Sequence, residues 1–202
     1  MLNGRIRYVV FGVAAVVLVL LGYAVGSWAS SRTPGDNSAE AGFARDMSTH
    51  HGQAVEMGMI AFQQSTNKDI ATLGGDIALT QKGQIGVMNT WLKDWGLDIN
   101  TSNPPMSWMP DGQRTLTNNL MPGMATRDEI KKLKSLQGKE FDILFCQYML
   151  RHHLGGVHMV DGVLSEDPIP EVKELAETMK KNQTAEIATL KKDLADMGAA
   201  PL

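Results

Sequence analysis

Four of the five histidines in this 202-residue chain form two His-His doublets, and each doublet begins three residues after a methionine. A second methionine follows seven residues after the first histidine of each doublet. On an α-helix, residues three, four and seven apart share a face, so each segment presents imidazole and thioether side chains together. We therefore predict a metal site built from two such helical faces. Its predicted ligands are His50, His51, His152, His153, Met47, Met57, Met149 and Met159.

The residue types narrow the choice of metal. Imidazole binds copper, zinc, iron and nickel, whereas thioether favours copper(I). Neither doublet carries a carboxylate at the Glu-x-x-His spacing of di-iron proteins, which disfavours di-iron oxidase chemistry. The single cysteine, Cys146, excludes internal disulfides and cysteine-based zinc or iron–sulfur clusters. A copper ion is therefore the expected cofactor, with another divalent metal left open.

Two further sets of residues bear on this site. Gln81 and Gln183 are expected at the level of the doublets, where a glutamine carbonyl could accept the second N–H of a metal-bound imidazole. We predict that these two amides orient the histidine rings. The pairs Met106-x-x-Met109 and Met121-x-x-Met124 are either additional thioether ligands or residues that pack a loop.

The segments that carry the doublets belong to an internal repeat. A shift of 102 residues aligns 43–98 with 145–200 without a gap, and twelve of the 56 positions are identical. Each copy contains two stretches with apolar residues at helical spacing, separated by a short turn. Short turns join antiparallel helices, so each copy is predicted to be a helical hairpin. Two such hairpins predict an all-α, ferritin-like four-helix bundle.

Local signals place the ends of these helices. Asn67 is expected to cap the second helix, and Asp167 to cap the last helix with Pro168 in its first position. Gly96 and Gly198 are expected to end the second helix of each copy. The capping box at 126–129 predicts a short helix that ends near Leu136. The predicted bundle spans 40–202, with a crossover at 99–140 between repeat one (43–98) and repeat two (141–200).

The N-terminal segment predicts the compartment. Residues 8–28 contain no charge and follow Arg5 and Arg7, a pattern typical of a transmembrane helix whose basic flank stays in the cytoplasm. We expect residues 1–30 to be a single-pass anchor in the cell membrane, followed by a tether at 31–39 and an extracytoplasmic domain. A cleaved signal peptide is the alternative and gives a secreted or periplasmic domain on the same side of the membrane.

Charge excludes one class of partner. Three of the 19 basic residues precede residue 36, and all 22 acidic residues lie in 36–202, so the body is acidic. An acidic body is a poor match for a phosphate backbone, and nucleic acid is not expected to bind. The expected partners are the membrane and a metal ion. A homo-oligomer or a protein that receives the metal is also possible.

The sequence resembles that of a known family. The pattern Phe-x-x-x-Met-x-x-His-His, at Phe43–His51 and Phe145–His153, is similar to that of the domain of unknown function 305 family. The segments 121–124 and 138–142 fit as well, and the resemblance covers roughly 43–198. It implies a ferritin-like helical bundle, usually exported or membrane-anchored, with some members tied to copper binding or copper tolerance. It does not imply an enzyme.

Three functions remain open from the sequence. The first is an extracytoplasmic metal-binding protein, with copper preferred, that acts as a buffer or chaperone. The second is a structural or interaction module in which the histidines and methionines only fill a core, because methionine is a common core residue. The third is a redox metalloenzyme. The sequence favours the first of these three.

Overall fold

The computed structural model describes residues 16, 19, 33–110 and 112–202. The chain divides after Pro34, and the description below concerns the unit Gly35–Leu202. The predicted membrane segment at 8–28 therefore lies almost entirely outside the described residues. Among the residues that the structure does describe, no helix is both long enough and apolar enough to cross a membrane.

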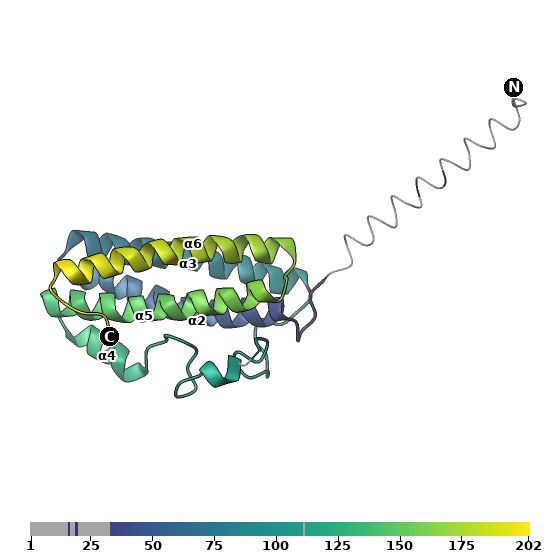
Figure 1. The fold of residues 1–202 in the computed structure, drawn as a ribbon, viewed down its shortest axis with the longest axis horizontal. Coiled ribbons are helices and arrows are strands. Elements are labelled where there is room, and N and C mark those ends of the chain that lie inside the picture. Colours follow the sequence, from purple (N-terminus) through teal and green to yellow (C-terminus); the bar gives the residue numbers. More distant parts are fainter. Residues whose placement is uncertain (1–15, 17–18, 20–32, 111) are drawn as a thin grey trace, which may run out of the picture. The chain divides into compact units, whose positions relative to one another are not determined.

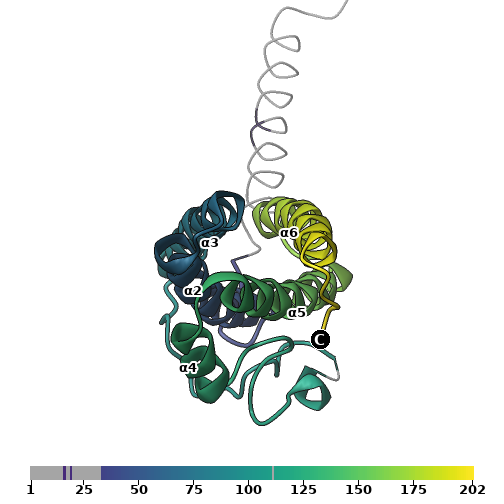
Figure 2. The same ribbon diagram turned by 90° about the vertical axis from the view of Figure 1, so that its left-hand side faces the viewer.

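The described part of the chain contains five α-helices and one short 3-10 helix (Figure 1). The four long helices lie side by side: α2 packs on α3, α5 packs on α6, and α2 packs on α5. The end-on view in Figure 2 shows α2 and α5 as neighbours, with α3 and α6 on the same side of them. This arrangement confirms the all-α prediction. The elements are α2 (Ala39–Gln64), α3 (Lys68–Asp94), η1 (Gly112–Thr115), α4 (Arg127–Ser135), α5 (Gly138–Ser165) and α6 (Pro170–Asp196).

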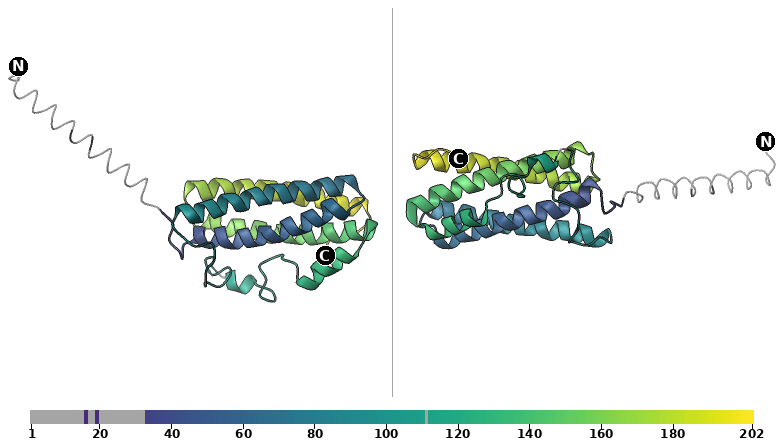
Figure 3. Two further views of the ribbon diagram at one scale, coloured as in Figure 1. Left: turned by 180° about the vertical axis from the view of Figure 1, so that it is seen from behind. Right: turned by 90° about the horizontal axis from the view of Figure 1, so that it is seen from below.

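The crossover between α3 and α5 covers the side of α2 and α5 that faces away from α3 and α6 (Figures 2 and 3). It contains η1 and α4, and α4 packs on α5. Asp46 of α2 fixes its first third, because the carboxylate accepts hydrogen bonds from the Met106 backbone N–H at 2.6 Å and from Trp108 Nε1 at 2.7 Å. The crossover is therefore anchored on the helix that carries the first histidine doublet.

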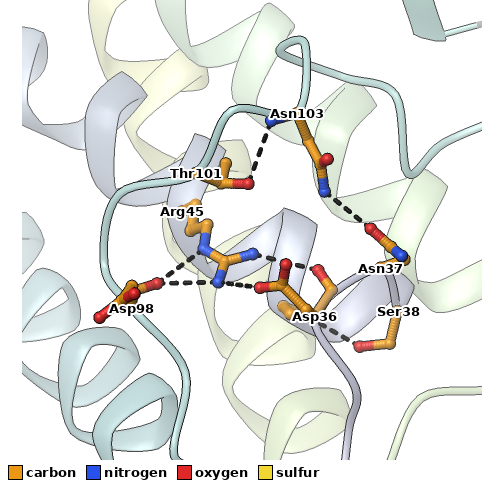
Figure 4. A network of polar contacts seen from close by, with 8 residues as sticks. Asp36, Asn37, Ser38, Arg45, Asp98, Thr101 and Asn103 are labelled. Carbon is orange, nitrogen blue, oxygen red and sulfur yellow. Dashed lines mark hydrogen bonds and ion pairs between the residues drawn. The ribbon is translucent and has the colours of Figure 1, made fainter.

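A buried arginine fixes the beginning of the crossover. Arg45 of α2 is only 5% exposed, and its guanidinium donates to the backbone carbonyl of Asp98 at 2.9 and 2.8 Å. The same guanidinium donates to the backbone carbonyl and the carboxylate of Asp36, as Figure 4 shows. Asn103 adds a side-chain hydrogen bond to Asn37. These contacts hold the chain just before α2 and the chain just after α3 together.

Most helix ends follow the predicted signals. Asn67 caps α3, and Thr126 and Glu129 form a capping box that opens α4. Gly96 (φ 71°) and Gly198 (φ 70°) each follow a helix in the left-handed conformation. At both ends the next residue donates to a carbonyl five residues back, which is the Schellman motif.

One predicted cap is wrong. The last helix begins at Pro170 with Ile169 as its cap residue, rather than at Pro168 after Asp167. Asp167 instead adopts a left-handed φ of 49° in the turn between α5 and α6. Of the two prolines in this turn, Pro170 occupies the first helical position. A backbone N–H at that position makes no hydrogen bond within the helix, so proline is tolerated there.

Cys146 lies on the buried face of α5 with no exposed surface, as expected for a small core residue. Burial raises the pKa of its thiol to about 12, with a smaller contribution from Asp193. The reactive thiolate is therefore scarce at neutral pH, so this cysteine is a packing residue in the folded protein.

Glycine allows α2 and α3 to approach closely. A Cβ on Gly74 of α3 would lie 2.7 Å from the backbone oxygen of Gly58 and 2.8 Å from the Cβ of Ala61. Both distances are shorter than van der Waals contact. The two helices can reach this separation only because Gly58 and Gly74 carry no side chain.

We predict opposite effects for two glycine-to-alanine changes in α3. Gly74→Ala should lower the free energy of unfolding by about 1–3 kcal/mol, because overpacking forces α2 and α3 apart. Gly83→Ala should raise it by up to about 1 kcal/mol, because a Cβ there meets no atom within 4 Å and alanine favours the helix. Urea denaturation of both variants measures the difference. Equal effects of the two changes would contradict this account of the α2–α3 contact.

Candidate metal centre

The two histidine doublets meet where α2 packs on α5. All four imidazoles are buried, with exposed fractions of 0–1%. The rings of His50 and His152 lie face to face, with centroids 3.8 Å apart and an angle of 32° between their planes. The His152 and His153 centroids are 6.3 Å apart. The structure therefore brings the predicted histidine ligands from both hairpins together.

Three of these histidines use Nε2 for a hydrogen bond to an oxygen. His50 Nε2 lies 3.0 Å from the carbonyl oxygen of Pro122, His51 Nε2 lies 2.8 Å from Gln84 Oε1, and His153 Nε2 lies 2.6 Å from Glu186 Oε2. A carbonyl and a carboxylate only accept, so each Nε2 carries the proton. The Nδ1 atom of each neutral ring then has a free lone pair. Metal-bound histidines show this same arrangement, in which the other ring nitrogen donates to a carbonyl or carboxylate.

The free nitrogens belong to a concentrated set of buried polar atoms. Among the described residues, ten buried side-chain nitrogen and oxygen atoms have no hydrogen-bond partner, and eight of them belong to the predicted site. Each such atom costs about 1–3 kcal/mol, so eight would cost on the order of 10 kcal/mol, comparable with the stability of a whole domain. The eight atoms are Nδ1 of His50, His51, His152 and His153, Nε2 of His152, Oε1 of Gln81, and Oε1 and Nε2 of Gln183.

Burial keeps three of these imidazoles, those of His50, His51 and His152, neutral. Desolvation lowers the pKa of His50 to about 4 and the pKa of His51 to about 3, and the His50 ring contributes to the second shift. Desolvation and the neighbouring histidines also hold the pKa of His152 well below its usual value. A neutral imidazole keeps the lone pair that a metal ion needs. These three rings are therefore in the ligand form at neutral pH.

The structure gives the histidines different partners from those predicted. Gln81 and Gln183 are buried, but they make no hydrogen bond to the doublets, and Gln183 lies against the backbone of Gly156. The acceptors are Gln84 and Glu186, which lie three residues further along α3 and α6. These two positions are themselves 102 residues apart, so the predicted repeat contained a signal for them. In the first hairpin the partner of His51 is thus an amide, and in the second hairpin the partner of His153 is a carboxylate.

The four predicted methionine ligands are fully buried on both sides of the histidines. Met47 and Met159 belong to one apolar cluster, and Met57 and Met149 belong to the other. Each cluster therefore combines one methionine from each hairpin. Among the described residues, no three His, Cys, Asp or Glu side chains are arranged as a ready metal site. Thioether sulfur and imidazole nitrogen together are a ligand set that favours a soft metal.

The backbone of the crossover covers the histidines, which the sequence did not predict. Pro122 supplies the carbonyl that His50 contacts, and the backbone of Gly123 (φ 78°) lies against Arg151 and His152. A Cβ on Gly155 of α5 would collide with the Pro122 carbonyl. Glycine at 123 and 155 therefore lets the crossover lie directly on the helix that carries the second doublet.

The fold and the site together define a helical protein with a buried cluster of four histidines and with buried methionines on the same helices. The chain belongs to the DUF305 family, a domain of unknown function, whose model matches residues 40–194. No curated protein matches the sequence significantly.

Solved structures share the fold over most of the chain. A DUF305 protein from Streptomyces coelicolor is 42% identical with a TM-score of 0.76, and the match covers 83% of this chain and 99% of that one. A DUF305 fragment from Deinococcus radiodurans is 28% identical with a TM-score of 0.65, covering 78% and 96%. CopM in its Cu(II)-bound form is 25% identical with a TM-score of 0.60, covering 77% and 94%.

We predict that acid destabilises the metal-free protein before its carboxylates titrate. The unfolded chain binds protons on His50 and His51 near pH 6.5, whereas the folded chain binds them only near pH 4 and 3. Unfolding therefore takes up protons, and stability falls as the pH drops below 6.5. Each imidazole should cost roughly 2 kcal/mol between pH 6.5 and 5.

Urea denaturation of the metal-free chain at pH 7, 6 and 5 measures this slope. His50→Leu should reduce it, and His158→Leu, at an exposed position of α5, should leave it unchanged. A stability that stays constant from pH 7 to pH 5 would show that the buried rings do not stay neutral.

Proposed function

We propose that this protein is an extracytoplasmic, membrane-anchored copper-binding protein that buffers or carries the ion through histidine and methionine side chains. The observation that carries the proposal is the hydrogen bonding that His50, His51 and His153 have in common. Each ring donates from Nε2 to an oxygen and keeps an unpartnered, buried Nδ1. A copper ion bound to these nitrogens would offset the cost of burying them.

The ligand set favours copper over harder metals. The predicted ligands are four imidazoles and four buried thioethers, and the only carboxylate in contact with a doublet, among the described residues, is Glu186 behind His153. Sulfur and nitrogen ligands suit Cu(I), whereas magnesium, calcium and manganese prefer oxygen. The four long helices form a ferritin-like bundle in this proposal, with the two hairpins as copies of one ancestral unit.

The relatives support the metal and the compartment. CopM has been solved with Cu(II), with Cu(I) and with silver bound. The Streptomyces coelicolor relative is described as a candidate secreted protein. An uncharged N-terminal segment behind two arginines agrees with export of the body, whether the segment remains as an anchor or is cleaved.

Copper(I) affinity of histidine variants tests the proposal. In the full-length protein, His50→Leu and His152→Leu should each lower the affinity by more than about 100-fold, because both hairpins contribute ligands to one centre. Loss of a residue that only hydrogen-bonds to a ligand already costs about 10–100-fold, and loss of a ligand itself should cost more. Competition with a chromophoric Cu(I) chelator under reducing conditions measures the affinity.

His158→Leu is the matched control, since it removes an exposed imidazole from the same helix and should leave the affinity unchanged. If all three variants bind copper like the natural chain, the histidines are core residues and the proposal fails. Half the stoichiometry with unchanged affinity at the remaining ion would instead replace the shared centre with two independent sites.

The carboxylate behind His153 should strengthen copper binding. Glu186→Gln gives the second hairpin the same partner that Gln84 provides in the first, and it removes the negative charge next to the imidazole. We expect the Cu(I) affinity to fall by about 10-fold, at the lower end of the effect of an outer partner, because the hydrogen bond is kept. Glu174→Gln, at an exposed position of α6, is the control and should have no effect.

A further inference from the structure

A second pair of thioethers lies on the crossover, outside the histidine centre. Met121 and Met124 both line a pocket of about 240 Å³ between the crossover and α5. Met121 is 5% exposed, and Met124 is half-buried. The pocket gives these two side chains access to solvent that the four predicted methionine ligands of the long helices lack.

Local geometry holds these two methionines together. Met121, Pro122, Gly123 and Met124 form a turn closed by a hydrogen bond of 3.1 Å from the Met124 N–H to the Met121 carbonyl. Proline in the second position and glycine with φ 78° in the third are the signature of a type II turn. Such a turn brings its first and fourth residues close together. The two thioethers therefore start from neighbouring backbone positions.

The same turn contacts the histidine centre. Its second residue, Pro122, accepts the hydrogen bond from His50 Nε2, and its third residue, Gly123, lies against the backbone of His152. Gly123 also lines the pocket, so the pocket and the histidine centre share this turn. Met121 directly precedes Pro122, whose carbonyl His50 contacts, and one residue separates Met124 from Pro122.

The two methionines of the pocket adjoin further methionines in the protein interior. Met121 belongs to the same apolar cluster as Met47 and Met159, and Met124 packs against that cluster from its half-buried position. Six of the fifteen buried residues of the cluster are methionines. Soft ligands therefore extend from the pocket to two of the predicted ligands of the centre.

The charges of the pocket suit a soft, monovalent ion. Its one carboxylate, Glu129, is engaged by Arg151 through two hydrogen bonds of 2.8 and 2.9 Å. Arg151 also holds the pKa of Glu129 below its usual value, so the two charges compensate each other. Among the described residues that line the pocket, no free carboxylate attracts a hard divalent cation, and the thioether sulfurs are the soft donors.

We propose that the Met121–Met124 turn is an entry site, at which Cu(I) or Ag(I) binds between the two thioether sulfurs before it reaches the histidine centre. This inference rests on the proposed function, because the ion's destination is the histidine centre. The ion keeps its oxidation state, and transfer consists only of ligand exchange from thioether to imidazole and thioether. The type II turn has two roles: it presents the two sulfurs to the pocket, and it closes the centre beneath.

The experiment follows the methionine methyl groups and the histidine rings by NMR. The full-length protein, labelled with 13C in its methionine ε-methyl groups and with 15N in its histidine rings, is titrated with Ag(I) as a redox-stable soft ion. The Met121 and Met124 resonances, assigned with single leucine variants, should shift from the lowest silver concentrations onward. The Met121→Leu/Met124→Leu variant should slow the appearance of silver-bound histidine signals roughly tenfold, equivalent to about 1.4 kcal/mol in the barrier.

Leucine conserves the volume of methionine, so the variant should fold, and Met124→Leu alone, at a half-buried position, is the milder test. Met59→Leu, at a methionine of α2 that is 38% exposed and does not line the pocket, is the matched control and should load silver at the normal rate. Shifts of Met47, Met159 and the histidines without shifts of Met121 and Met124 would overturn the entry site while supporting the proposed function. Shifts confined to Met121 and Met124, with silent histidines at saturation, would overturn the transfer and the proposed function together.

Discussion

The burial of four imidazoles at the contact between α2 and α5 is the constraint on which the structure depends. His50 and His152 stack at 3.8 Å, which two charged rings would oppose, and burial lowers the pKa of both. Each neutral ring must still satisfy two nitrogens, and oxygens of the protein satisfy only one nitrogen on each of three rings. A core built for stability alone would place leucine at these positions, because leucine leaves no polar atom unpaired.

Much of the remaining structure maintains this contact. Glycines at 123 and 155 let the crossover reach the rings, and Asp46 and Arg45 anchor the crossover on α2. The acceptors behind the rings come from α3 and α6, so all four long helices contribute to one centre. The two hairpins differ there, because Gln84 is neutral and Glu186 is a carboxylate. Occupied by Cu(I), the centre would therefore be electrostatically asymmetric even though its ligands come in pairs.

The sequence predicted the parts of this site that depend on spacing within one helix. The doublets, their flanking methionines, the Asn67 cap and the glycine stops all follow from local patterns, and the helices lie where those patterns place them. The wrong or missing parts depend on contacts between segments. Gln84 and Glu186, rather than Gln81 and Gln183, meet the histidines because the relative height of two helices is set by side-chain packing, and an error of one turn is three or four residues. Pro122 could not be predicted, since nothing local shows where a crossover of some forty residues will lie.

The central claim is that the buried imidazoles and thioethers bind one soft metal ion together. X-ray absorption at the copper K-edge, on the full-length protein loaded with Cu(I) to saturation, tests this claim most directly. The copper neighbours should include both sulfur and imidazole nitrogen, and the imidazole contribution should fall in the His50→Leu/His152→Leu variant, which keeps only His51 and His153. Copper surrounded by light atoms without sulfur, or an imidazole contribution that the double change leaves unaltered, would contradict a shared histidine–methionine site.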